Sequence, residues 1–567
     1  MKVARASWFV VLVVLVVTLV VPALRQQLRV ALEELRHANL RQTDEYPPAL
    51  TTSLLKPYRD RAIAFVNQRY ASDPDMLMAA ALLTEDTDLL ERAAEMGKSP
   101  VAWAAYVERL MQTVPTFHRI GGSGVDPADA EAVREEEKRI AEEGQPAKLT
   151  PEQAEPYLSA LRTWQEADPE NALPVALEAR FLYGLHRDED ALTVWAQAGR
   201  MPLVSSHALE RSRAVRRLLV AMGMPKPEAM VNADMSLVFP SFARLRDSAR
   251  FATYEGRLAA MSNDPTTAIT WWQSTADFGE HVRDSADTLI GCLVGIAIQG
   301  IGAAPVWRWV PDQVSGVPNG PLLGGRYFWG AQHTLYVEHM GAEAADGMRD
   351  SLVLGKLKSQ ASREYMKGLG AYEGYFGAGR YLVFAGASFL LAAFLLVVYL
   401  VFCSWSRRAA DEATNLHALW QLVLAVLILT PLVAGAVIAL RQAPFDHQAE
   451  GKMIAALVSG LAGFVLLILA IPLLSAIPSR AAGFRFRTAW RGNLRRLLPV
   501  MIALCAIIFL GMSAYAAHLR SQWAQKWSAP GVSEMSDMVR SLGDKWTHPT
   551  IPADAWRAEY PPAPPAR

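Results

Sequence analysis

Residues 381–403 read YLVFAGASFLLAAFLLVVYLVFC, an apolar run without a single Asp, Glu, Lys or Arg. At the 1.5 Å rise of an α-helix, about 20 such residues cross the roughly 30 Å hydrocarbon core of a bilayer. A helix in the core of a soluble protein seldom stays apolar on every face over this length. We therefore expect this run to span a membrane.

Three further runs near the carboxyl end have the same character, and the four together predict a transmembrane cluster. None contains a charged residue, and the only imidazole, that of His417, lies at the edge of its run. The composition agrees, since 51% of the 567 residues are hydrophobic while the basic and acidic residues balance at 56 each. The expected spans are residues 381–403, 416–440, 453–478 and 497–517.

The apolar run at the N-terminus, Trp8–Val21, is shorter than these four. Val21-Pro22-Ala23 offers small residues that loosely suit cleavage of a signal peptide, whereas the direct continuation into Leu24-Arg25-Gln26 favours a retained signal anchor. We prefer the anchor and assign residues 1–24 to it.

Arginine is concentrated between the third and fourth runs of the cluster, in a stretch without acidic residues. Short loops rich in Lys and Arg stay on the cytoplasmic side, where they lie against anionic headgroups. This predicts an inner-membrane protein of a bacterium, with residues 25–380 and the tail 518–567 outside the cytoplasm. The alternative is that the arginine-rich stretch is a docking site for a cytoplasmic partner. Its arginines are Arg480, Arg485, Arg487, Arg491, Arg495 and Arg496.

Small residues recur every four positions along the third run, at Ala455, Ser459 and Gly463. Such a stripe lets a second helix approach closely in a membrane. Packing within the four-helix cluster is the favoured interpretation, and a contact between copies of an oligomer is the alternative.

Residues 25–380 predict a large all-α domain, because apolar positions from about 50 to 300 follow the helical period and almost none alternate. Thr150-Pro151-Glu152-Gln153 is a strong helix start, with Thr150 as N-cap and Gln153 placed to bond back to it. Asp-Pro pairs that stop one helix and begin the next mark three more boundaries: Asp73-Pro74, Asp168-Pro169 and Asp264-Pro265.

The pattern Ala191-Leu192-Thr193-Val194-Trp195 is echoed by Ala268-Ile269-Thr270-Trp271-Trp272, each after an Asp-containing turn. With the stretch Ala167–Ala172 before the first of them, these patterns resemble tetratricopeptide-type repeats. The resemblance implies stacked antiparallel helix pairs with a concave surface. It covers part of the domain only, and the full Trp-Leu-Gly-Tyr pattern is not present, so an irregular helical bundle remains the alternative.

Residues 303–330 are rich in Gly, Pro and Trp, which predicts an ordered loop packed over the helices in preference to a mobile lid. The sequence contains no complete catalytic or metal-binding motif. Gly97-Lys98-Ser99 lacks the glycine that a phosphate loop needs five positions earlier, and His333 and His339 are six residues apart and point away from each other on a helix. We expect no metal and no cofactor. Balanced charge also argues against nucleic acid as a partner.

Two functions follow as hypotheses. The first is a membrane-anchored helical-repeat scaffold or assembly subunit that binds other envelope proteins, because repeat-like helices accompany spans without charges. The second is a permease-like membrane subunit of a multi-component transport complex, energised by a partner chain. An enzyme is the least favoured class, since no catalytic constellation supports it.

Overall fold

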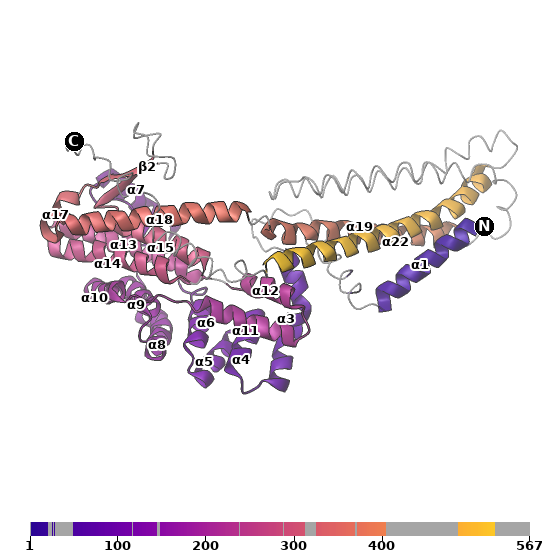
Figure 1. Cartoon of the computed structure of the whole chain (residues 1–567), viewed down its shortest axis with the longest axis horizontal. Helices are drawn as coiled ribbons and strands as arrows, with labels where there is room; N and C mark the ends of the chain where they lie inside the picture. The colour runs from indigo at the N-terminus through magenta and orange to yellow at the C-terminus, as the bar shows by residue number, and fades with distance from the viewer. Residues whose placement is uncertain are drawn as a thin grey trace. The chain divides into compact units, whose positions relative to one another are not determined.

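The computed structural model describes residues 2–20, 25, 28, 49–115, 117–144, 148–237, 239–286, 288–311, 325–368, 371–403 and 486–527 (Figure 1). These residues are mostly helical and fall into two compact units. The first unit comprises Met1–Pro57 and Gly370–Lys526, and the second comprises Tyr58–Leu369 and Trp527–Arg567.

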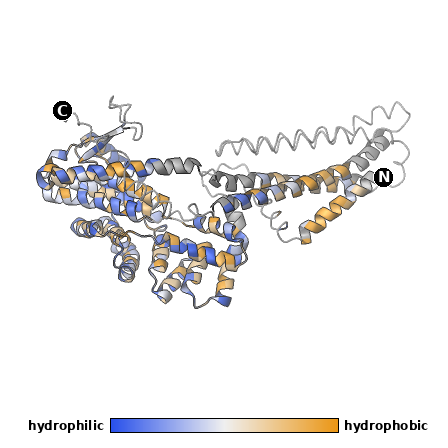
Figure 2. Cartoon of the chain, in the orientation of Figure 1, coloured by the Kyte–Doolittle hydropathy of each residue, from blue (hydrophilic) through white to orange (hydrophobic). Residues whose placement is uncertain are grey.

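Three helices form most of the described part of the first unit: α1 (Lys2–Val20), α19 (Ala371–Cys403) and α22 (Phe486–Trp527). The start of α3, up to Pro57, belongs to it as well. Their apolar colouring is visible in Figure 2. Two segments, Phe384–Val401 and Leu498–Gln525, are long and apolar enough to cross a membrane by length and composition. The predictions for 381–403 and 497–517 therefore coincide with helices of the required kind. In α1 the apolar part, Ala6–Thr18, is shorter, and its role as a signal anchor stays a prediction.

The three helices pack through one apolar cluster. Leu391 and Leu395 of α19 meet Leu498 and Ile502 of α22. Nearer the other end, Tyr381 contacts Tyr515 edge to face, so α19 and α22 run antiparallel. Trp8 of α1 joins the cluster, with its ring 5.0 Å from that of Tyr399.

Helix α22 corrects one expectation from the sequence. It begins at Phe486, so the backbone at Arg487, Arg491, Arg495 and Arg496 is helical and does not form a loop. Arginine is a good helix former, and the run of arginines extends the apolar helix without a break. Likewise α19 starts at Ala371, ten residues before the predicted span. The other residues predicted to belong to the cluster lie outside the described part of the chain: 416–440, 453–478, Ala455, Ser459, Gly463, Arg480 and Arg485.

The second unit is built from a succession of helices, of which α18 is the longest with 27 residues. Their bounds are α3 (Ala49–Arg69, of which the second unit takes the part from Tyr58), α4 (Pro74–Thr84), α5 (Thr87–Gly97), α6 (Pro100–Leu110), η1 (Ile120–Ser123), α7 (Ala130–Glu143), α8 (Pro151–Ala167), α9 (Ala172–Gly184), α10 (Asp188–Arg200), α11 (Ala208–Ala221), α12 (Lys226–Met235), α13 (Pro240–Met261), α14 (Pro265–Ser285), α15 (Leu289–Ala303), α17 (His333–Met340) and α18 (Ala342–Gly368).

Helix starts in this unit are largely those that the sequence predicts. Thr150 and Gln153 form the complete capping box of α8. Asp73 and Asp264 accept backbone N–H bonds at the starts of α4 and α14, each with Pro at the first position. Asp168 is the exception, because it lies at the end of α8 and Asn171 caps α9 instead.

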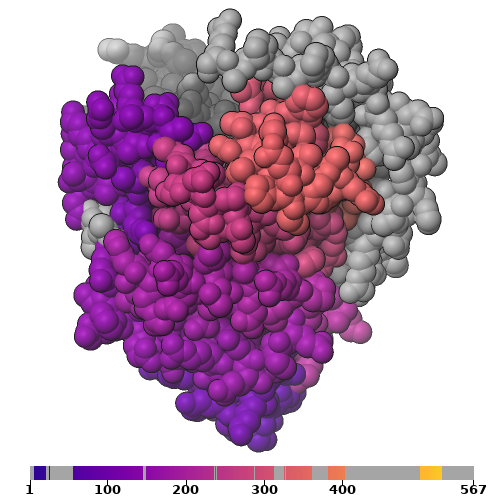
Figure 3. All heavy atoms as spheres, turned by 90° about the vertical axis from the view of Figure 1, so that its left-hand side faces the viewer, coloured from indigo at the N-terminus to yellow at the C-terminus, as the bar shows by residue number. Residues whose placement is uncertain are grey.

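Consecutive helices pack against each other along much of the unit, including α9 with α10 and α13 with α14. The two echoed motifs lie in α10 and α14, and these helices are also in contact. Trp195 and Trp272 are both almost fully buried, and the indole N–H of Trp195 donates to Thr275 Oγ1 at 2.9 Å. The echo thus marks core positions. Figure 3 views the unit from the end that carries α17, where the pink and salmon segments of α14, α17 and α18 lie side by side.

One departure from an all-α fold is a pair of antiparallel strands, β1 (Trp307–Pro311) and β2 (Gly325–Trp329). The sequence predicted a loop over this region. Aromatic residues favour strands, and Trp309 faces Tyr327 across the pair with ring centroids 4.9 Å apart. The indole N–H of Trp307 donates to Ala345 O at 2.8 Å, which fixes the strand pair to α18.

Glycines bring α14 and α15 unusually close. A Cβ placed on Gly279 would lie 2.2 Å from the backbone N of Gln299, and one on Gly295 would lie 2.3 Å from the backbone N of Arg283. Both distances are far inside van der Waals contact, and backbone atoms cannot swing aside as the tip of a side chain can. The absence of a side chain at these positions therefore sets the spacing of the two helices.

Gly295→Ala should lower the free energy of unfolding of the second unit by about 2 kcal/mol or more, because the new methyl group forces the helices apart. Gly300→Ala is the matched control on the same helix, since nothing lies within 4 Å of its added Cβ; it should be neutral or stabilise by up to about 1 kcal/mol. Thermal unfolding of the full chain followed by circular dichroism measures both. Equal effects of the two variants would contradict the close packing.

Candidate functional site

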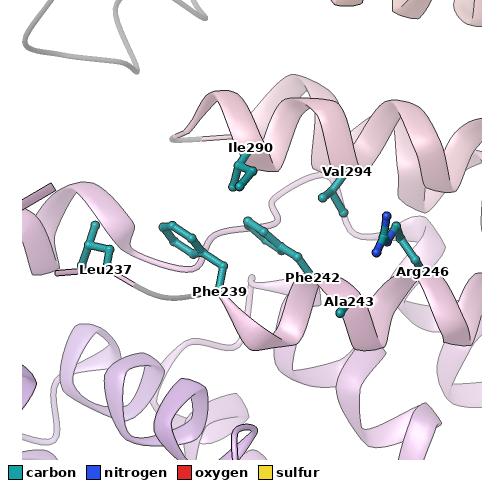
Figure 4. A pocket seen from close by; sticks show the side chains of 7 residues that line it. All are labelled: Leu237, Phe239, Phe242, Ala243, Arg246, Ile290 and Val294. Carbon is teal, nitrogen blue, oxygen red and sulfur yellow. The ribbon is translucent and has the colours of Figure 1, made fainter. Parts of the chain in front are cut away.

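A pocket of about 420 Å³ opens on the second unit between the start of α13 and the start of α15 (Figure 4). Its described lining is apolar except for one cation, Arg246. Phe239 and Phe242 are stacked, with ring centroids 5.1 Å apart, and stand opposite Ile290. The described residues lining it are Leu237, Phe239, Phe242, Ala243, Arg246, Ile290 and Val294.

A buried carboxylate fixes the start of α13, which carries most of this lining. Glu108 of α6 is 2% exposed and accepts two hydrogen bonds from Ser241, one from Oγ at 2.6 Å and one from the backbone N–H at 3.2 Å. A carboxylate at a helix N-terminus also meets the positive end of the helix dipole. Burial nevertheless raises the pKa of Glu108, although Arg211 and the Ser241 bonds oppose the rise.

Arg211 of α11 links this buried charge to the pocket. Its side chain is 1% exposed and its guanidinium carbon lies 5.5 Å from the centre of the Phe239 ring. The pocket wall is therefore backed by an ordered cation and a carboxylate from two other helices. Truncating one member of such a set leaves the other charge buried without compensation, so the loss of either member should destabilise this wall.

The chemistry of the pocket follows from the side chains that line it. Its described lining holds no nucleophile, no general acid or base and no group of metal ligands. What it offers is contact with apolar groups and one positive charge at the edge. Ile290 is 51% exposed, so a large apolar side chain is left in water beside a concave wall.

A second polar cluster, between α14, α15 and α18, is structural. The fully buried guanidinium of Arg283 donates to Gln299, to Ser351 and to the carboxylate of Asp284, and Lys358 donates to the same carboxylate at 2.7 Å. Apart from the contact between the neighbours Arg283 and Asp284 within α14, these contacts join helices of the unit to one another.

Asp277, also on α14, is a partly buried acid outside the pocket. Gln273 Nε2 donates to Asp277 Oδ1 at 2.6 Å, and Tyr336 of α17 donates to Gln273 Oε1. Burial raises the pKa of Asp277 to about 6, and the nearby charge of Glu280 adds to the rise. No described cation pairs with Asp277.

The candidates from the sequence lie elsewhere. The small-residue stripe at 455–463 is outside the described residues, and the described arginines of the basic stretch lie on α22 in the first unit. His333 is stacked on Trp329 and stands edge to face with Trp307, while His339 Nδ1 contacts Leu335 O. Within the part of the chain that the structure describes, no three His, Cys, Asp or Glu residues are placed to hold a metal.

Sequence reasoning missed the pocket. The available signal was α15 itself, Leu289–Ala303, which is apolar on all faces yet too short to span a bilayer. Comparison with known proteins adds no further constraint, because no family model, curated protein or solved structure matches the chain.

Ser241→Ala removes the 2.6 Å hydroxyl bond to a buried carboxylate. We expect a loss of about 1–3 kcal/mol in unfolding free energy, since the carboxylate keeps its burial and loses a partner. Ser262→Ala, at the exposed end of the same helix, should change it by less than about 0.5 kcal/mol. Thermal unfolding compares them, and equal effects would show that the Glu108 contact does not hold α13.

Asp277→Asn should stabilise the protein at pH 8 and leave it unchanged near pH 4. The folded-state pKa of about 6 lies above the ordinary value of 3.8, so the unfolded chain releases its proton first and stability falls as pH rises from about 4 to 6. Because Asn resembles the protonated acid, the variant does not lose this stability. Its unfolding free energy at pH 8 should exceed that of wild type by roughly 1–2 kcal/mol.

The difference in melting temperature between Asp277→Asn and wild type, measured at both pH values, tests this. Glu170→Gln, at an exposed position, is the control. A difference that does not depend on pH would show that Asp277 keeps its ordinary pKa in the fold.

Proposed function

We propose that the chain is a membrane-anchored helical scaffold that binds other envelope proteins through its second unit. The apolar segments Phe384–Val401 and Leu498–Gln525 support the anchoring. Paired helices around a core of buried indoles support a binding domain of the tetratricopeptide type. Outward exposure of the second unit in a bacterial inner membrane belongs to the same proposal and rests on the arginines of the 480–496 stretch.

The observation that carries the proposal is the pocket at Phe239 and Phe242. Its walls are held by buried charges, yet its lining is apolar and open, and Ile290 beside it remains half exposed. An apolar centre with aromatic side chains and a charged edge matches the hot-spot core and polar rim of protein interfaces. The cost of leaving this surface in water is offset when a partner covers it.

Site-specific cross-linking tests the proposal. A photoreactive residue at Ala243, exposed at the pocket, should yield defined adducts with envelope proteins in intact cells, and the same residue at Met96, on exposed α5, should not. Adducts of the same identity should co-purify with the full chain in mild detergent.

Three outcomes are informative. Matching adducts and co-purified proteins support the scaffold. A stoichiometric ATPase in the preparation would replace it with the permease-like subunit. A homogeneous chain with no partner and no adduct would contradict both functions.

A further inference from the structure

Helices α13 and α15 run parallel and form a surface longer than the pocket. At one end Phe242 and Arg246 of α13 lie opposite Ile290 and Val294 of α15. Further along, Thr253 Oγ1 donates to Ile301 O at 3.2 Å. The two helices therefore run side by side in the same direction away from the pocket.

The outer side of α15 is apolar over this distance. Ile290, Val294, Ala297 and Ile301 follow a spacing of four, three and four residues, which places them on one face of a helix. Ile290 and Ala297 are exposed and the other two are partly exposed. At 1.5 Å per residue the stripe is about 16 Å long. We call this stripe, together with the pocket, the α13–α15 groove.

Arg246 supplies the charge of the groove. Two other arginines of α13 are engaged, Arg250 with Asp247 at 3.4 Å and Arg257 with Asp126 at 2.9 Å. Arg246 is exposed and forms no ion pair with any residue that the structure describes. A carboxylate arriving at this edge would therefore meet a cation that no other group of the fold already neutralises.

We propose, on the basis of the proposed function, that the α13–α15 groove binds an amphipathic helix of the partner that carries an acidic residue beside its apolar face. Three anchors at i, i+4 and i+7 span about 10 Å, which the stripe accommodates. The carboxylate pairs with Arg246 while the first anchor enters the pocket between Phe242 and Ile290. A lipid surface fits less well, because the pocket is concave and receives a protruding side chain.

Two synthetic helical peptides test the proposal with the full chain in detergent. Both carry Leu at i, i+4 and i+7, and they differ by one Glu or Lys next to the first Leu. Fluorescence anisotropy should show the Glu peptide binding about five-fold more tightly, as one exposed ion pair allows. Arg246→Glu should invert this preference.

Ile290→Glu should weaken both peptides at least ten-fold, because it places a charge in the apolar stripe. Met261→Glu is the control, since Met261 is exposed at the far end of α13 and should leave binding unchanged. Melting temperatures equal to that of wild type confirm that each variant is folded.

A preference between the peptides that survives Arg246→Glu, or binding that survives Ile290→Glu, overturns the proposal. A test with vesicles that contain one third phosphatidylglycerol could also overturn it. If Ile290→Glu abolishes binding to these vesicles and leaves peptide binding unaffected, the groove contacts lipid. If the peptides do not bind as expected but partner adducts still form at Ala243, the proposed helical ligand is wrong and the scaffold function is still supported.

Discussion

The second unit depends on how closely α14 and α15 approach each other. Gly279 and Gly295 allow backbone contact there, and no larger residue could replace them without separating the helices. This contact buries one side of α15 completely, so Arg283 and Gln299 can bond across the interface. It also leaves the opposite side of an apolar helix at the surface. The core and the candidate binding surface are thus two faces of one short helix.

Local chemistry made part of this fold predictable. The capping box at Thr150 and the Asp-Pro starts of α4 and α14 are decided within four residues, and the structure has them as expected. Length and apolar character sufficed likewise for α19 and α22. The predicted helix start at Asp168 was wrong because its carboxylate contacts Asn171 and His207. A local sequence rule contains no information about His207, which is 39 positions away.

The candidate site could not be derived in this way. Glu108 and Ser241 are 133 positions apart, and neither lies in a motif. The strand pair was missed for a related reason, since Trp309 and Tyr327 favour strands only when they face each other. The sequence of α15 is apolar on every side of the helix. That property alone does not show which side packs in the core and which side is exposed.

The grouping of α1 with α19 and α22 has a consequence for biosynthesis. Trp8 packs on Tyr399 and belongs to a cluster that includes Leu498. The ribosome therefore completes α1 long before its neighbours exist, and the whole second unit is translated in the interval. Until then Trp8 and Val11 lack the apolar partners that they contact in the finished unit, and the first unit closes last.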